Sequence, residues 1–120
     1  MQEYLLIIRT EGNPWEVLSP EQQQKHVEKA AAYIGNIIKE GKLKGAQPLE
    51  LEGSIISNTQ GTWKDGPFNE SKEVIAGYFL ITADSLDEAK NIAKANPIFE
   101  DQLKARIEVR PIKTVEGINQ

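Results

Sequence analysis

The chain has 120 residues, 39% of them hydrophobic and 27% charged, which predicts one domain over residues 1–120 with a real core rather than a disordered chain. With 14 Lys and Arg against 18 Asp and Glu, the net charge is -4, and the absence of a basic excess argues against a nucleic-acid partner. The lack of cysteine excludes disulfides and thiolate sites, and the longest apolar run, residues 4–8, is far below the roughly 20 residues of a membrane span, so we expect a soluble, cytoplasmic protein without a membrane partner.

The first predicted element is a strand over residues 3–9. Both of its alternating sets of side chains are apolar, which is typical of a strand that is buried on both faces. Residues 10–18 follow as a loop, because they contain the breakers Gly12, Asn13 and Pro14. We expect Trp15 in this loop to fold back onto the core.

A long helix is predicted from Ser19 to about residue 40. Serine caps a helix, proline suits its first turn, and Gln22 stands where a capping box places Glu or Gln. Gly41 ends the helix as a left-handed cap. The residues expected to form its apolar stripe recur at spacings of three and four: Val27, Ala30, Ala31, Ile34, Ile37 and Ile38.

The middle of the chain is predicted to hold a connection, a strand and a turn. Residues 42–48 are rich in Gly and Pro and are expected to be a connection, and a second strand is expected over residues 49–58. Residues 58–61 indicate a turn, and residues 62–64 a short returning arm. A polar loop over residues 65–73 follows.

The last third of the chain predicts a strand, a helix and a strand. Residues 74–83 are apolar on both faces, and Ser85 with Glu88 forms the pattern of a second capping box. The second helix should stop before Pro97, because the residue before proline avoids the helical region. The last strand is expected over residues 104–110, with the proline that follows ending its pairing.

This order of elements predicts an α+β fold of the ferredoxin-like βαββαβ type, with an antiparallel four-stranded sheet and an extra hairpin arm. Two helices can cover one face of such a sheet, yet the strands at residues 3–9 and 74–83 are apolar on both faces. A second copy packed sheet to sheet, forming a homodimer, would cover the other face. The alternative is that the loops at residues 10–18 and 58–73 fold over it.

The densest polar stretch is the loop of residues 65–73, which opens with the turn signal Asp-Gly-Pro. In a functional interpretation the loop presents Asp65, Glu70 and Lys72 into a cleft, where they bind a polar ligand or transfer protons. In a structural interpretation the loop is pinned in place by Phe68 and Asp65, and the charged side chains are solvated.

His26 is the only histidine, at the border of the apolar stripe of the first helix. It is a candidate general base, because imidazole alone has an ordinary pKa near neutrality. The alternative is a half-exposed surface histidine.

Three arginines, Arg9, Arg106 and Arg110, lie near the ends of strands expected to be neighbours. They could bind a carboxylate, or they could form a charged rim with Glu108 and Glu3. No spacing of carboxylates and histidine matches a metal-ligand pattern, so neither a metal nor a cofactor is expected.

The Asp-Gly-Pro-Phe motif that begins at Asp65, followed by Glu70, Lys72-Glu73 and Gly77-Tyr78, resembles the DGPF signature of the YCII-related domain family. The resemblance covers nearly the whole chain. The other segments that carry it are residues 4–7, Trp15, residues 18–21, residues 41–43, Leu49, residues 86–89, Pro97 and residues 108–111.

The resemblance implies a dimeric α+β barrel. It also implies that some relatives use a histidine–aspartate pair on and near the first helix, while others stand beside alternative sigma factors and act in regulation. Lys29 and Lys39 occupy the helix positions where such a pair is expected, and His26 lies about one turn earlier. The family site is therefore better sought in the DGPF loop.

We accordingly predict a cleft beside the DGPF loop that binds a small polar molecule, with Asp65 or His26 as the catalytic residue of acid–base chemistry that needs no cofactor. The alternative is a non-catalytic regulatory or interaction module in which the DGPF loop is structural. The expected ligand-binding residues are Phe68, Glu70, Lys72, Glu73 and Arg9.

Overall fold

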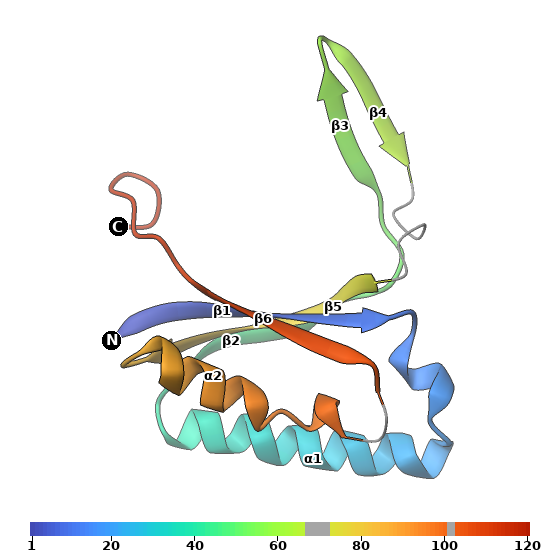
Figure 1. Cartoon of the computed structure of the whole chain (residues 1–120), viewed down its shortest axis with the longest axis vertical. Coiled ribbons are helices and arrows are strands. Elements are labelled where there is room, and N and C mark those ends of the chain that lie inside the picture. Colours follow the sequence, from blue (N-terminus) through green and yellow to red (C-terminus); the bar gives the residue numbers. More distant parts are fainter. Residues whose placement is uncertain (67–72, 101–102) are drawn as a thin grey trace.

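The chain folds into a four-stranded antiparallel sheet with both helices on one face and a separate two-stranded hairpin (Figure 1). The computed structural model describes residues 1–66, 73–100 and 103–120. The elements are β1 (Gln2–Glu11), the 3₁₀ helix η1 (Pro14–Val17), α1 (Pro20–Lys39), β2 (Leu43–Pro48), β3 (Ile55–Thr59), β4 (Thr62–Gly66), β5 (Glu73–Ala83), α2 (Leu86–Lys94), the 3₁₀ helix η2 (Pro97–Phe99) and β6 (Ala105–Pro111).

The sheet has the strand order β2-β5-β1-β6, and every neighbouring pair is antiparallel. Its four strands alternate with the two helices as the ferredoxin-like pattern requires, so the predicted fold class is confirmed. The β3–β4 pair forms a second sheet by itself, as the predicted hairpin arm. Its turn consists of Gln60 and Gly61, both with positive φ (52° and 86°), which suits a two-residue turn between twisted strands.

The core lies between the sheet and the helices. Because side chains alternate along a strand, Leu6 of β1 and Ile81 of β5 point to the helix side and are almost fully buried. Tyr33 and Ile37 of α1 pack on them together with Ala89 and other small residues of α2.

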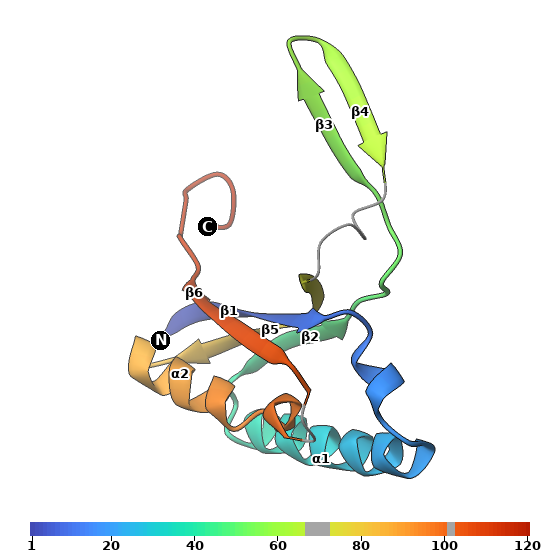
Figure 2. The same ribbon diagram turned by 45° about the vertical axis from the view of Figure 1, so that its right-hand side comes forward.

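In the part of the chain that the structure describes, no helix covers the opposite face of the sheet (Figure 1). Leu5 and Ile7 of β1 and Tyr78 and Leu80 of β5 lie there and are partly buried. The β3–β4 hairpin and the segment after β6 both project to this side, away from the helices, in both ribbon views (Figures 1 and 2). We call this surface the open face. The radius of gyration of 16.4 Å exceeds the roughly 13.5 Å of a compact chain of this length, which agrees with the two projecting segments.

The helix ends follow from local hydrogen bonds. The Ser19 hydroxyl accepts the Gln22 N–H at 3.1 Å and the Gln22 side chain accepts the Ser19 N–H at 2.8 Å, which confirms the first capping box. Gly41 has a φ of 73° and takes the left-handed position after α1. At α2, Ser85 accepts the Glu88 N–H, but the Glu88 carboxylate accepts the Asp84 N–H instead of returning to Ser85, so the second box is only half formed.

Two predicted boundaries in the middle of the chain are wrong. Residues 43–48 form edge strand β2 rather than a connection, and residues 49–54 are not a strand. Residues 43–48 have little β-propensity, and it is the long neighbour β5 that supplies the hydrogen-bonding partners. At the other end, pairing continues through Pro111, and the Ile112 N–H donates to the Glu3 carbonyl at 2.9 Å.

The predicted apolar stripes are correct only in part. Ile37 is buried, but Val27 and Ile38 are 50% and 59% exposed. His26 and Tyr33, which the predicted stripe did not include, are buried instead, so the buried face of α1 is rotated about the helix axis from the predicted one. Leu86 at the start of α2 is also exposed. Among the described residues, no helix combines the length and the apolar character that crossing a bilayer requires.

Candidate functional site

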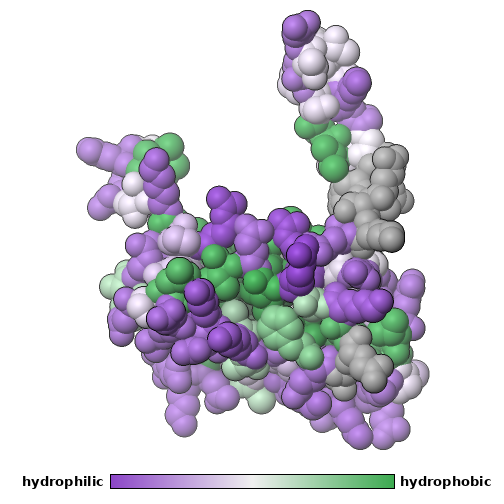
Figure 3. All heavy atoms as spheres, in the orientation of Figure 1, coloured by the Kyte–Doolittle hydropathy of each residue, from purple (hydrophilic) through white to green (hydrophobic). Residues whose placement is uncertain are grey.

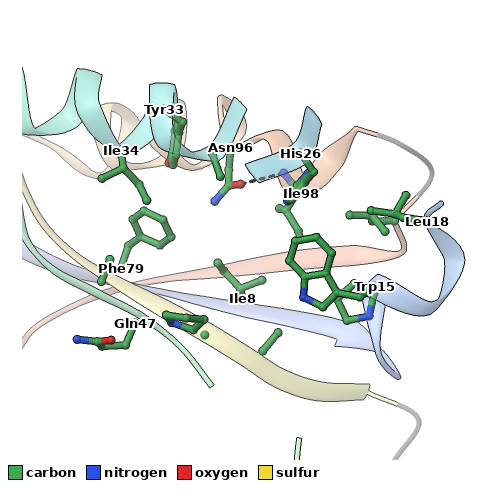
Figure 4. A pocket seen from close by; sticks show the side chains of 17 residues that line it. Ile8, Trp15, Leu18, His26, Tyr33, Ile34, Gln47, Phe79, Asn96 and Ile98 are labelled. Atoms are coloured by element: carbon green, nitrogen blue, oxygen red, sulfur yellow. Dashed lines mark hydrogen bonds between the residues drawn. The ribbon is translucent and has the colours of Figure 1, made fainter. Parts of the chain in front are cut away.

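A cavity of about 290 Å³ lies between the helix-facing side of the sheet and α1. Phe79 of β5 lies at one end and Trp15 of η1 at the other, with Ile8 of β1 between them on the sheet side (Figure 4). His26 and Tyr33 of α1 line the opposite wall. Most of the lining is apolar, as in small-molecule sites, and the volume lies near the lower limit of the range for such sites.

The cavity is closed at one end by the turn that carries Trp15. Asn13 caps this turn by accepting the Trp15 N–H at 2.9 Å, and the Gln23 side chain of α1 donates to the Trp15 carbonyl at 3.0 Å. The indole packs edge-on against the His26 imidazole, with 5.6 Å between ring centroids and 82° between ring planes. The prediction that Trp15 folds back onto the core is confirmed in that it lines the cavity, although the residue remains 40% exposed.

Small residues leave the space that the aromatic rings enclose. Ala30 faces the cavity from α1, Ala46 from β2, and Ala76 and Gly77 from β5. The pairing of β1 with β5 shifts by one residue here, so that Ala76 is extra, as in a β-bulge. The cavity therefore results from small side chains on α1, β2 and β5, and two of them lie at the irregular pairing of β5 with β1.

The polar groups of the lining differ in what they can do. The Tyr33 hydroxyl donates to the Ile92 carbonyl at 2.6 Å, and burial raises the pKa of Tyr33 to about 12, so the phenol stays protonated near neutral pH. The Asn96 side-chain oxygen accepts the Ile98 N–H at 2.8 Å and caps η2. These two side chains hold the wall in place.

His26 lies on the same side of the cavity as Asn96 (Figure 4) and is only 7% exposed. The alternative of a half-exposed surface histidine is therefore wrong. His26 is the one imidazole among the residues that line the cavity. The structure thus places the chain's single imidazole at the wall of an apolar cavity.

A second hollow of about 500 Å³ adjoins the cavity and shares Trp15, Pro48 and Ala76 with it. It is lined on its outer side by residues of the segment after β2, including Glu50 and Glu52. The two hollows therefore share part of their lining, and the second one adds two acidic residues.

Arg9 and Glu73, which were predicted to bind ligand, lie in an ion-pair network on the open face. Glu73 accepts two hydrogen bonds of 2.6 Å from Arg106 and lies 3.9 Å from Arg9, which also contacts Glu108 at 3.1 Å. The hydrogen bonds from Arg106 lower the pKa of Glu73 below its usual value, and Arg9 adds to the effect. The arginines thus form a charged rim with Glu108 and Glu73, whereas Glu3 pairs with Lys44.

The remaining predicted residues lie elsewhere. Asp65 is exposed in β4, opposite Ile56, and the hairpin stands on the side of the sheet away from His26 (Figure 1). Phe68, Glu70 and Lys72 lie outside the described residues. Within one chain, the structure therefore does not bring Asp65, Arg9 and His26 together.

Several residues of the cavity had no functional signal in the sequence. Ala46 lies in an edge strand and Asn96 follows a helix, and their sequence neighbours are ordinary for such positions. Gly77 did carry a signal, because glycine inside a strongly apolar strand indicates a close backbone approach or a bulge. Lys29, at one of the positions of the family pair, contacts Glu100 at 3.3 Å.

In the part of the chain that the structure describes, no group of three His, Asp or Glu side chains is arranged to hold a metal ion.

Comparisons with known proteins identify the family. No curated protein matches the chain. The family model of the YCII-related domain matches residues 2–113, nearly the whole chain. The chain therefore belongs to the YCII-related domain family.

Proposed function

We propose that this protein binds a small, largely apolar molecule in the cavity between the sheet and α1, and that His26 exchanges a proton with it. The observation that carries the proposal is a buried imidazole on the wall of a cavity lined mainly by aromatic and aliphatic side chains. This lining favours a largely apolar ligand, whereas the sequence predicted a small polar molecule beside the DGPF loop.

Acid–base chemistry at this site depends on His26. Tyr33 cannot serve as a base near neutral pH, because its pKa is raised to about 12 and its hydroxyl is already engaged as a donor. Imidazole can both accept and donate a proton at neutral pH, and no cofactor is needed for such a step. The supporting geometry is the edge-on contact with Trp15, which orients the ring.

Asp65 and the DGPF loop remain a proposed second part of the site. Asp65 is exposed on the hairpin, on the side of the sheet away from His26 (Figure 1). The two residues of one chain therefore cannot contact the same small ligand, and a shared site would need Asp65 from a second chain. The regulatory alternative has different consequences, since it needs neither a ligand in the cavity nor proton exchange at His26.

We also propose that the open face pairs with a second copy. The exposed surface of one chain is 8617 Å², roughly 2,000 Å² more than the about 6,500 Å² expected of a compact monomer of this mass. A standard interface covers about 800 Å² on each partner, so the excess is large enough for a stable dimer. The partly buried apolar residues of β1 and β5 form the centre of this face.

Binding in the cavity can be tested with the neutral fluorescent probe N-phenyl-1-naphthylamine. The chain has two tryptophans, so Trp63→Phe leaves Trp15 as the only energy donor, at the cavity itself. We expect saturable energy transfer from Trp15 to the probe. Ala30→Leu fills the cavity and should weaken binding at least tenfold, whereas Ala32→Leu, on the exposed side of the same helix, should leave it unchanged. Equal binding by the two variants would place the probe elsewhere.

Proton exchange can be tested with 4-nitrophenol, whose visible absorption reports its own ionisation. We expect the ionisation midpoint of the bound probe to shift from its value in solution, and His26→Gln to abolish most of that shift while the N-phenyl-1-naphthylamine affinity changes little. An unchanged midpoint shift in the variant would assign proton exchange to another group.

A further inference from the structure

The β3–β4 hairpin stands apart from the four-stranded sheet with nearly all of its surface in water. Every residue of β3 and the first four residues of β4 are exposed. An isolated two-stranded hairpin is marginally stable at best in water. Among the described residues of one chain, the hairpin therefore lacks the packing surface that such ribbons need.

The two faces of the hairpin differ in character. Asn58 pairs with Trp63 and Ile56 with Asp65, so Ile56 and Trp63 lie on one face as diagonal neighbours. They are 67% and 71% exposed, and Trp63 is the largest apolar side chain of the hairpin. The other face consists mainly of hydroxyl and charged side chains, with Ile55 at its base.

We infer that the hairpin is an exchanged arm, whose Ile56–Trp63 face packs against the flank of a second copy of this chain. The inference rests on the proposed pairing of the open faces. The hairpin and the segment after β6 project from two ends of the sheet to the side of the open face, and hydrophobic side chains gather at the level of the sheet below them (Figures 2 and 3). A second chain seated on that face would lie between the two projections.

The dimensions agree with an arm that crosses the interface. Two packed sheets lie about 10 Å apart, whereas a five-residue strand spans about 17 Å. The hairpin is therefore longer than the gap between paired sheets and long enough to reach the flank of a partner. The surface excess of roughly 2,000 Å² per chain is also more than twice the about 800 Å² of a standard interface, which leaves area for the arm besides the sheet.

The test uses Trp63 as the reporter of the contact. In the full-length Trp15→Phe variant, Trp63 is the only tryptophan. We expect its emission to be shifted to the blue at concentrations where sedimentation equilibrium shows a dimer, and to move to the red on dilution into the monomer range. Ile56→Ser should raise the dimer dissociation constant at least tenfold, and Ile55→Ser, on the opposite face, should raise it less than threefold.

The outcomes separate the arm from the sheet pairing. A dimer in which Trp63 emits as in water and Ile56→Ser has no effect would overturn the arm and leave the pairing of open faces intact. A monomer at every concentration would overturn both. Blue-shifted Trp63 emission in a monomer would show that the hairpin packs on its own chain, which also contradicts the arm. Binding of an unrelated protein by the hairpin, without formation of a dimer, would also contradict the exchanged arm.

Discussion

Gly77 shows how one residue shapes both the sheet and the cavity. A Cβ at this position would lie 2.8 Å from the Gln47 carbonyl oxygen and 3.2 Å from the Pro48 Cα, so β2 could not approach β5 as it does. The close approach brings Pro48 and Gly77 together on the cavity wall. The glycine is thus required by the backbone packing.

We expect Gly77→Ala to lower the free energy of unfolding by about 1–3 kcal/mol, because the added methyl overpacks the contact with β2. Urea unfolding measures the change. Gly45→Ala is the matched control on the partner strand, since its Cβ would meet nothing within 4 Å. Equal stability of the two variants would contradict the account of the β2–β5 approach.

At the residue scale, the sequence singled out Trp15 and His26 but did not predict the cavity that they line, because the predicted cleft lay beside the DGPF loop. Trp15 and His26 were singled out because they are rare residue types with distinct chemistry. The cavity also needs small side chains such as Ala46 and Ala76, which have no signature of their own. A cavity arises from the way in which several elements pack together. The residue pattern within one element therefore cannot predict it.

At the element scale, an ion pair ties α2 to the link between α1 and β2. The Lys42 ammonium lies 2.8 Å from the Glu88 carboxylate in the first turn of α2. The hydrogen bond from Lys42 lowers the pKa of Glu88, the Asp84 N–H adds to this, and the same pair raises the pKa of Lys42. A carboxyl whose pKa is lower in the folded chain stabilises the fold above its usual value of 4.5 and loses that effect as the pH falls through the folded value.

We therefore expect part of the stability of the protein to disappear on acidification, through Glu88 and, by the same sign, through Glu73. Thermal unfolding between about pH 6 and about pH 3 measures this loss. Glu88→Gln should be less stable at the upper end and lose less stability on acidification. Asp87→Asn, in the same helical turn, controls for the removal of one negative charge. Parallel pH profiles of wild type and Glu88→Gln would exclude the pair as a source of the acid sensitivity.

Which elements could be predicted depended on the strength of their local signals. Helix α1, strands β1 and β5 and the turn of the hairpin followed from capping residues, apolar runs and Asn and Gly placement. Strand β2 did not, because its residues (LKGAQP) carry no alternating apolar pattern and become a strand only by pairing with β5. Residues 49–54 were predicted to be part of a strand, but only the Leu49 N–H bonds to β5, donating to the Ala76 carbonyl at 2.8 Å, and residues 50–54 form no strand.

At the scale of the whole molecule, two strands that are apolar on both faces predicted that one chain forms half of a larger core. The pairing of two copies remains a prediction. The structure adds the open face, the projecting hairpin and the excess surface that support it. The cavity lies on the other side of the sheet, between β5 and α1. The proposed ligand site and the proposed pairing surface therefore lie on opposite faces of one sheet and can be tested separately.

The proposal that the cavity beside His26 is the ligand site can be tested directly by nitrogen-15 NMR of the labelled protein, because the chain has one imidazole and two indole groups that give separate signals. On titration with 4-nitrophenol, we expect saturable shifts of the His26 imidazole and Trp15 indole signals, with the Trp63 indole signal unchanged. Shifts confined to Trp63, or no shift of His26 and Trp15 at the highest probe concentration, would contradict it.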